Sequence, residues 1–341
     1  MNNLKQKVAI VGGAGFIGFS LAKYLSSIFN VKILDVREPT DLPNNVLFNL
    51  CDVRRYSDVE RALSDVDLVI NTAIVQIPLI NENKRLAYEV NILGTANVCK
   101  VVEECPRVKG MLLSGTWHVI GERELSGVID EEFGFRPDKV EDRARLYALS
   151  KMGQEVIVRF YSEMSDKTFG IIRMGTVLGD GMPEKTAANI FITKGLRGET
   201  ITPFKHSMYR PMLYVDVIDV CKIYEEFAEK ILKDSVEKTD NSLTNIVNFY
   251  YPKPVTILDL AGIVQASIIK HTNCEITPKI EVSDQNKPLL FKENDKNKLK
   301  VDITKAQEMF KLQDIISPSE SIMRIVKSRA LFRSKAKKKK S

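Results

Sequence analysis

A glycine-rich segment near the start of the chain constrains the fold more than any other feature of the sequence. Gly12, Gly15 and Gly18 are spaced three residues apart. They connect the continuous apolar run 8–12 to residues 16–28, where apolar side chains recur at helical spacing. A strand, a glycine loop and a helix in this order are typical of a turn that brings backbone N–H groups close to a pyrophosphate. The segment therefore predicts a dinucleotide-binding unit.

The alternation of strand and helix patterns continues through the first half of the chain. Expected strands cover residues 8–12, 31–35, 46–50, 67–73, 108–115, 168–174 and 245–251, and expected helices cover 16–28, 57–65, 84–105, 144–164 and 213–231. This order predicts an α/β protein with a Rossmann-type, doubly wound parallel sheet and a smaller C-terminal α/β substrate-binding region.

The domain boundaries follow from where this alternation weakens. We expect an NAD-binding domain at 1–174, to which residues 213–251 return. Residues 175–212 and 252–325 then form the substrate-binding region, and 326–341 a disordered basic tail.

The net charge of +6 arises near the C-terminus. Residues 324–341 contain nine basic residues and no acidic one, so the remainder has 41 basic and 44 acidic residues. One interpretation is a tail that contacts anionic membrane lipid or nucleic acid. The other is a solvated, frayed terminus.

Other classes of protein are not indicated. The sequence contains no run of about 18 apolar residues, so it predicts no membrane span. Its N-terminal segment lacks the layout of a signal peptide. We therefore expect a cytoplasmic protein. The five cysteines are scattered without a Cys-x-x-Cys pair, which favours reduced thiols and no metal site.

Residues at the ends of the predicted strands point to a particular cofactor. Asp35 ends the second strand, where a carboxylate accepts hydrogen bonds from the adenosine ribose and repels a 2′-phosphate, which favours NAD over NADP. Asp52 and Val53 follow the third strand, on the expected adenine side. Thr72 and Ala73 follow the fourth, where the backbone should pass close to the cofactor.

A tyrosine and a lysine four residues apart form a candidate catalytic pair. Tyr147 and Lys151 lie on one face of the predicted helix 144–164. A nearby ammonium group and a positive nicotinamide ring lower the pKa of a phenol, which can then take a proton from a substrate hydroxyl as hydride leaves the same carbon. Ser114 and Thr116 end the fifth strand, where a hydroxyl can bind the substrate oxygen.

These segments together resemble the extended short-chain dehydrogenase/reductase family, in particular its NAD-dependent epimerase/dehydratase group and the nucleotide-sugar epimerases within it. The resemblance covers about residues 6–325. The segments that carry it are GGAGFIG (12–18), Asp35, Asp52-Val53, VNILGT (90–95), SGTWHVIG (114–121), YALSK (147–151), RMGTVLGDG (173–181), YRPMLYVDVID (209–219) and DITKAQEMF (302–310).

The resemblance implies a role for each matching residue. Thr116, Tyr147 and Lys151 would be the catalytic trio, and Lys151 would also bind the nicotinamide ribose. The implied cofactor contacts are Gly12, Gly15, Phe16, Ile17, Gly18, Asp35, Asp52, Val53, Thr72, Ala73, Asn91, Ser114, Tyr147 and Lys151. A homodimer built on the helices 84–105 and 144–164 is also implied.

The candidate substrate contacts depart from this pattern. Thr176 stands where nucleotide-sugar enzymes usually have Asn, and the late arginine that grips the diphosphate is missing, whereas Arg210 matches another diphosphate contact. Trp117 and His118 replace the Asp-Glu pair of 4,6-dehydratases, so dehydration of that kind is not expected. Trp117 is a pocket wall or a core residue, and His118 an acid/base or a packing residue.

Three functions fit these residues. The first is epimerisation of a nucleotide-diphosphate sugar, in which hydride passes to NAD and back through a keto intermediate. The second is NAD-dependent oxidation or reduction of a non-nucleotide alcohol or ketone. The third is a non-catalytic NAD-binding scaffold.

Overall fold

A seven-stranded parallel sheet forms the centre of the protein. The computed structural model describes residues 5–236, 241–312 and 314–338. The strand order is β11-β7-β5-β4-β1-β2-β3, and every neighbouring pair is parallel. The strands are β1 (Lys7–Val11), β2 (Asn30–Asp35), β3 (Val46–Leu50), β4 (Leu68–Asn71), β5 (Gly110–Thr116), β7 (Thr168–Met174) and β11 (Ile246–Phe249).

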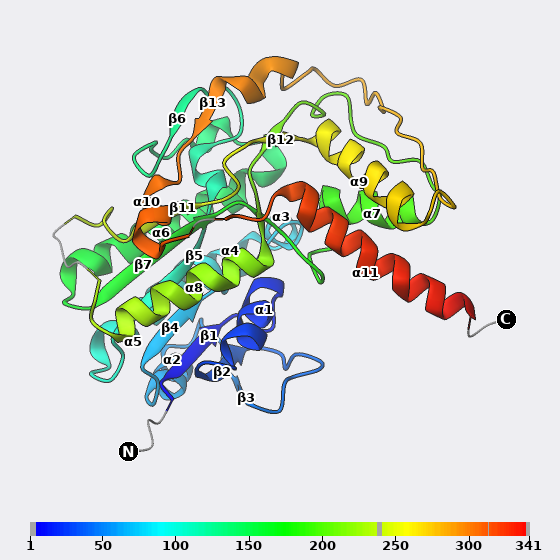
Figure 1. Cartoon of the computed structure of the whole chain (residues 1–341). Helices are drawn as coiled ribbons and strands as arrows, with labels where there is room; N and C mark the ends of the chain where they lie inside the picture. Colours follow the sequence, from blue (N-terminus) through cyan, green and yellow to red (C-terminus); the bar gives the residue numbers. More distant parts are fainter. Residues whose placement is uncertain (1–4, 237–240, 313, 339–341) are drawn as a thin grey trace.

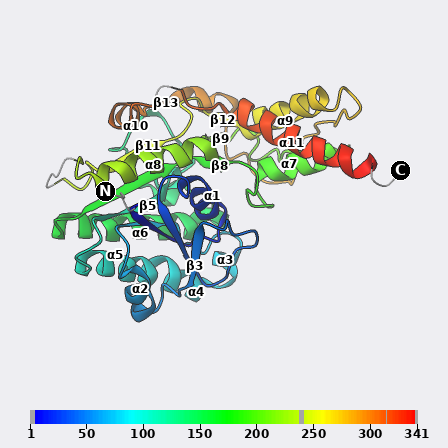
Figure 2. The same cartoon turned by 60° about the horizontal axis from the view of Figure 1, so that its bottom comes forward.

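Helices cover both faces of this sheet. Figure 2 shows α1 and α8 on one side of the strands and α2, α5 and α6 on the other. The helices of this part are α1 (Phe16–Leu25), α2 (Tyr56–Leu63), α3 (Leu79–Glu82), α4 (Lys84–Tyr88), α5 (Gly94–Glu104), α6 (Arg145–Met164), α8 (Val217–Leu232) and α10 (Thr304–Phe310). Because both faces are covered, every residue of β4 and β5 is buried, as their continuous apolar sequences require. The predicted doubly wound parallel sheet is confirmed.

The predicted helix 84–105 has an irregular middle. Between α4 and α5 the residues Glu89–Leu93 form one turn of π-helix, η1, so three segments follow one another without a break. The buried amide of Asn91 lies in this turn, and its Nδ2 donates to the Val75 carbonyl (3.2 Å) and to Ser150 Oγ (3.1 Å). The wider turn thus directs one polar side chain inward, toward the loop after β4 and toward α6.

The remaining strands and helices gather at one end of the sheet (Figure 1). They are β6 (Gly127–Ile129), β8 (Thr176–Leu178), α7 (Ala187–Leu196), β9 (Pro211–Met212), β10 (Tyr214–Asp216), β12 (Val255–Thr256), α9 (Ile257–His271), β13 (Leu299–Val301) and α11 (Pro318–Lys338). They pair as β10 with β8 and β13 with β6 in parallel, and as β12 with β9 in antiparallel fashion. Short 3₁₀ turns cover Trp117–Ile120 (η2), Pro137–Lys139 (η3), Asp142–Ala144 (η4) and Glu293–Lys298 (η5).

Two expectations about secondary structure were wrong. Residues 214–216, expected in a helix, form strand β10, and α8 begins at Val217 because Asp216 caps it by accepting from Ile218 N (2.8 Å). The tail, expected to be disordered from residue 326, continues α11 as far as Lys338. This helix is anchored up to the first residue of the predicted tail, since Ile322, Ile325 and Val326 are buried. Residues 339–341 lie outside the described part, and the domain boundaries stay predictions.

We predict that Phe227 on α8 contributes strongly to the stability of the sheet. The side chain is fully buried, and its ring lies 5.0 Å from the ring of Phe310 on α10. Phe227→Ala should lower the free energy of unfolding by about 3–5 kcal/mol, because it leaves a cavity in the core. Phe332→Ala, at a side chain that is 73% exposed, should change it by less than about 0.5 kcal/mol. Equal effects in guanidinium titrations would contradict this assignment.

Candidate active site

The glycine loop between β1 and α1 packs closely against the backbone that follows β4. Gly12 has a φ of +73°, and a Cβ there would lie 2.6 Å from the Cα of Ala73. A Cβ on Gly18 would lie 2.6 Å from the Gly12 carbonyl oxygen. A Cβ on Gly15 would meet only that same oxygen, at 3.3 Å, so this glycine faces open space. The loop is thus held by backbone contacts and leaves room beside Gly15.

The N-terminus of α1 is suited to an anion. Gly15 is its N-cap, no side chain caps it, and its first turn contains no acidic residue. The N–H groups of a first helical turn have no partner within the helix and attract negative charge. The open space at Gly15 and these N–H groups fit the pyrophosphate of a dinucleotide, with Phe16 and Ile17 in the first turn.

Asp35 is held beside the glycine loop. Its Oδ2 accepts from Ala14 N (3.0 Å), and its Oδ1 accepts from Arg37 N (3.3 Å). The carboxylate therefore stands at the carboxyl end of β2, next to the loop that fits the pyrophosphate. This position agrees with binding of the adenosine ribose.

The other candidate cofactor residues have mostly structural contacts. Asp52 pairs with Arg54 (2.6 Å), whose hydrogen bond lowers the pKa of the carboxyl. Val53 is buried, and its side chain is apolar. Its backbone carbonyl oxygen accepts a hydrogen bond from Asn97 Nδ2 (2.9 Å). The Thr72 hydroxyl donates to the carbonyl of Val11 (2.8 Å), at the start of the glycine loop. These residues shape the wall of the site, and their contacts with the cofactor stay predictions.

The proposed catalytic trio comes together from two elements. The end of β5 carries Ser114 and Thr116, and the first turns of α6 carry Tyr147 and Lys151. Lys151 is buried, and its Nζ donates to the Ser114 carbonyl oxygen (2.7 Å). The Thr116 hydroxyl lowers the pKa of the Tyr147 phenol, so the two side chains lie near each other. The predicted spacing on one helix face therefore brings both side chains to the end of β5.

Burial alters the acidity of both groups on α6. It lowers the pKa of Lys151 to about 7. It raises the pKa of Tyr147, and the Thr116 hydroxyl only partly opposes that effect. Without a ligand the site therefore favours a neutral phenol and a lysine that readily loses its proton.

A cluster of charged side chains lies next to the trio, and sequence reasoning missed its two acids, Glu122 and Glu141. Glu122 is 1% exposed, and its Oε1 lies 3.4 Å from His118 Nε2 and 3.6 Å from Arg210 Nη1. The same Arg210 nitrogen lies 2.7 Å from Glu141 Oε1. Glu141 N in turn donates to Glu122 Oε2 (3.0 Å). Both acids stand in irregular segments, where no periodic pattern signals burial, so only the fold reveals the cluster.

The candidate substrate residues fall into two groups. Trp117 is fully buried, its Nε1 donates to Thr176 Oγ1 (3.4 Å), and its ring packs in the hydrophobic core. This contact supports the packing interpretation of Trp117. His118 and Arg210 belong to the cluster of charged side chains, where Arg210 is already paired with two carboxylates.

The described residues show no other reactive centre. No group of three or more His, Cys, Asp and Glu side chains in the described ranges is arranged to hold a metal ion. The cysteines are all free thiols.

Comparison with known proteins identifies the family. A model of the NAD dependent epimerase/dehydratase family matches residues 8–236. The chain belongs to this family. Its members are NAD-dependent enzymes, and the matched range contains the glycine loop, the trio and the cluster of charged side chains. The predicted family, the enzyme class and the cofactor are therefore confirmed.

Curated relatives within the family differ in activity. The chain is 29% identical over 204 residues to a putative UDP-glucose 4-epimerase of Methanocaldococcus jannaschii, covering 57% of this chain and 64% of that protein. It is 30% identical over 138 residues to human short-chain dehydrogenase/reductase family 42E member 1, covering 39% and 35%. Bovine sterol-4-alpha-carboxylate 3-dehydrogenase, decarboxylating, is 33% identical over 118 residues, covering 34% and 32%. The chain thus matches about a third to two thirds of these relatives.

Solved structures share the fold across nearly the whole chain. The UDP-glucose 4-epimerase of Thermus thermophilus in complex with NAD superposes with a TM-score of 0.74 at 21% identity, covering 94% of this chain and 98% of that one. The UDP-glucuronic acid 4-epimerase of Bacillus cereus in complex with NAD gives 0.72 at 19% identity, covering 93% and 96%. The epimerase-like fold therefore includes the second region as well as the parallel sheet.

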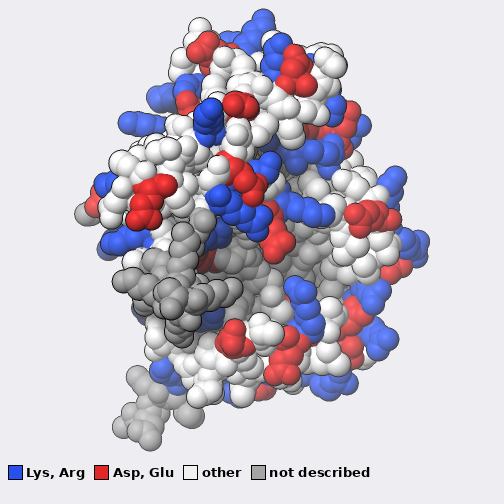
Figure 3. All heavy atoms as spheres, turned by 90° about the vertical axis from the view of Figure 1, so that its right-hand side faces the viewer, with Lys and Arg blue, Asp and Glu red and all other residues white. Residues whose placement is uncertain are grey.

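The described helices and the charged surface bear on contacts with a membrane or with nucleic acid. Among the described helices, none has the length and apolar character needed to cross a membrane. On the face that bears the C-terminal end of α11, basic and acidic side chains are interspersed (Figure 3). Tail contact with anionic membrane or nucleic acid, and the cytoplasmic location, stay predictions.

We predict that Asp35 determines the choice between NAD and NADP. Asp35→Asn retains an oxygen that can accept from Ala14 N but removes the negative charge. We expect the Kd for NAD to rise on the order of 10-fold, because hydrogen bonds to charged groups are stronger than neutral ones, and the Kd for NADP to fall. Asp41→Asn is a matched control in an exposed loop, where Asn tolerates the φ of 58°. Titration calorimetry measures both constants, and an unchanged NAD/NADP ratio in the Asp35 variant would contradict the assignment.

Proposed function

We propose that the protein is an NAD-dependent epimerase of a nucleotide-diphosphate sugar, which acts through a transient keto intermediate. The observation that carries the proposal is the meeting of Thr116, Tyr147 and Lys151 at the end of β5, at the same edge of the sheet as the glycine loop. This arrangement fits reversible removal of a proton and a hydride from a secondary alcohol. The resemblance to nucleotide-sugar epimerases and the Methanocaldococcus relative support the sugar substrate.

The residues divide the chemistry as follows. The Thr116 hydroxyl binds the substrate oxygen, and Tyr147 takes its proton. Lys151 holds the ribose of the cofactor and, when protonated, stabilises negative charge on Tyr147. NAD, when bound, accepts the hydride from the carbinol carbon and returns it. Rotation of the ketone between the two transfers inverts the configuration.

A second candidate function rests on Arg210. Its guanidinium lies 2.7 Å from Glu141 and 3.6 Å from Glu122, so two buried carboxylates already balance its charge. An arginine paired in this way is less available to a diphosphate. This observation favours net oxidation or reduction of a non-nucleotide alcohol or ketone, and the sterol dehydrogenase relative supports that candidate.

Proton NMR of the anomeric signals distinguishes these functions. We expect the purified protein to release NAD on denaturation and to convert at least one member of a panel of UDP-, GDP- and dTDP-sugars. Tyr147→Phe should reduce conversion on the order of 10²–10⁴-fold, because it removes the acid/base group. Tyr56→Phe, at a surface tyrosine bonded to Glu104, is the matched control.

Two other outcomes would support the alternative functions. Stoichiometric formation of NADH with a non-nucleotide alcohol, and no conversion of sugars, would support the dehydrogenase. A cellular phenotype that Tyr147→Phe leaves unchanged would support the non-catalytic scaffold.

We also propose that the protein is a homodimer that pairs through α6 and the helices from 84 to 104. Apolar side chains along α6 are exposed, with Phe160 at 64% and Met164 at 60%. Leu149 on the same helix and Leu93 in η1 are exposed too. Side chains of this kind on adjacent helices are typical of an interface.

Sedimentation velocity tests the dimer. Phe160→Glu should convert a dimer to a monomer, because the charge would be buried without a partner. Phe332→Glu, on α11 and 73% exposed, should leave the oligomeric state unchanged. A wild-type monomer at micromolar concentration would contradict the proposal.

A further inference from the structure

A short turn that follows β8 lies against the first residue of α1. In this turn, residues 179–182, the N–H of the last residue donates to the carbonyl oxygen of the first (3.2 Å). A Cβ on Gly179 would lie 3.2 Å from Phe16 Cζ, and a Cβ on Gly181 would lie 3.5 Å from Phe16 Cδ2. Phe16 directly follows Gly15, beside which the pyrophosphate of NAD fits. The backbone of the turn therefore borders the cofactor-binding end of α1.

The turn also packs closely against the start of α8. A Cβ on Gly179 would lie 2.5 Å from Val217 Cγ1, in the first residue of that helix. Gly181 has a φ of +86°, a backbone conformation that residues with a side chain rarely adopt. The turn thus fits between the first residues of α1 and α8, and its position against Phe16 depends on what holds it from the remaining side.

Helix α7 holds that side of the turn through one buried amide. Asn189 Nδ2 donates to the Met182 carbonyl oxygen (2.8 Å), the last carbonyl of the turn. Asn189 Oδ1 accepts from Arg329 Nη1 on α11 (2.7 Å). Arg329 Nε also lies 3.7 Å from Asp180 Oδ1, but an exposed ion pair of this length contributes little. Arg329, Asn189 and Met182 therefore connect α11 to the turn.

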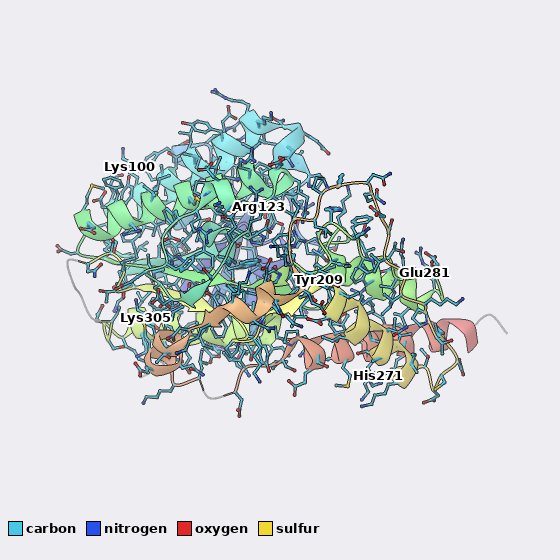
Figure 4. All side chains as sticks on the ribbon, turned by 90° about the horizontal axis from the view of Figure 1, so that it is seen from above. Lys100, Arg123, Tyr209, His271, Glu281 and Lys305 are labelled. Atoms are coloured by element: carbon cyan, nitrogen blue, oxygen red, sulfur yellow. The ribbon has the colours of Figure 1, made fainter. Side chains whose placement is uncertain are left out.

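Helix α11 presents Arg329 from a fixed position. The buried carboxylate of Asp216 accepts from Ser321 Oγ (2.6 Å) and from Arg324 Nη2 (2.5 Å), both on α11. Farther along, α11 packs against α7 and α9, and His271 at the end of α9 lies beside it (Figure 4). Because Asp216 also caps α8, α11 is bound to one of the helices that border the turn.

We propose that Arg329 is a positioning residue for the cofactor, which slows the release of NAD by holding the turn 179–182 against Phe16 through Asn189. Release of a bound molecule often requires the segments around it to move apart. Surface turns open locally at a low cost in free energy unless side-chain contacts hold them. Arg329 increases that cost because its hydrogen bond to Asn189 involves a charged donor. The inference concerns binding alone and does not depend on which reaction follows.

Exchange of radiolabelled NAD measures the release directly. Purified protein loaded with labelled NAD is mixed with an excess of unlabelled NAD, and the retained label is followed over time. Arg329→Ala should raise the off-rate on the order of 10-fold, because a hydrogen bond to a charged group is lost. The on-rate should change little, and Tm should fall by no more than about 4 °C. An unchanged off-rate, with or without lower stability, would overturn the proposal.

Two further variants separate a positioning role from a structural one. Arg329→Lys retains the charge and a donor group, so the off-rate should return most of the way to that of the wild type. Asn189→Asp retains an acceptor for Arg329 but loses the Nδ2 group that donates to the Met182 carbonyl. It should raise the off-rate as Arg329→Ala does, and the double variant should release NAD no faster than either single variant. Increases that multiply would show that the two residues act independently, and the proposed connection would be wrong.

A matched control lies two residues before Arg329 on the same helix. Lys327 is exposed, and its charge acts on His271 at the end of α9. Lys327→Ala removes the same charge from α11 and should leave the off-rate unchanged. An equal rise would show that the overall charge of α11 retains NAD, which would overturn the role of Arg329. A wild-type protein that converts no sugar or alcohol, yet shows the effect of Arg329→Ala, would refute the proposed function and leave this inference intact.

Discussion

The hydrogen bond from Lys151 Nζ to the Ser114 carbonyl oxygen joins the two elements on which the site depends. It crosses from α6 to the carboxyl end of β5 inside the protein, where water does not compete for it. Because β4 alone separates β5 from β1 and all three strands are parallel, the end of β5 lies at the same edge of the sheet as the glycine loop. A helix attached at that point places Tyr147 within reach of Thr116 and of a cofactor bound on α1.

The glycine loop, on the cofactor side of the site, is held in place by close packing against the backbone after β4. Gly12 lies so near Ala73 that any side chain would collide with backbone, so the loop has little freedom to move. Asn91 fixes the loop after β4 to α6 through Val75 and Ser150. The cofactor cradle and the catalytic helix are thus parts of one hydrogen-bonded frame, which is the arrangement that precise hydride transfer requires.

In the predicted substrate-binding region, the family resemblance and the observed side-chain contacts indicate different roles for Arg210. An arginine that matches a diphosphate contact is present, yet Arg210 is balanced by Glu122 and Glu141 in the folded protein. One of these carboxylates, Glu122, lies near His118, whose Nδ1 contacts the hydroxyl of Thr116. Arg210, a candidate diphosphate contact, and His118, a neighbour of Thr116, therefore belong to one cluster of charged side chains.

Local pattern was enough to predict the doubly wound sheet, the glycine loop, Asp35 and the trio. Gly12 is required by its own backbone conformation, and Tyr147 and Lys151 share a face by the geometry of one helix, so neighbouring residues carry the signal. The end of α11 was misread because nine basic residues resemble a disordered tail, whereas Ile325 and Val326 bury against distant helices. Arg210 and Glu141 are 69 residues apart, and their charges meet only after the chain has folded. Short-range geometry thus determined the parallel sheet and the NAD-binding loop, and long-range burial decided which charges surround Arg210.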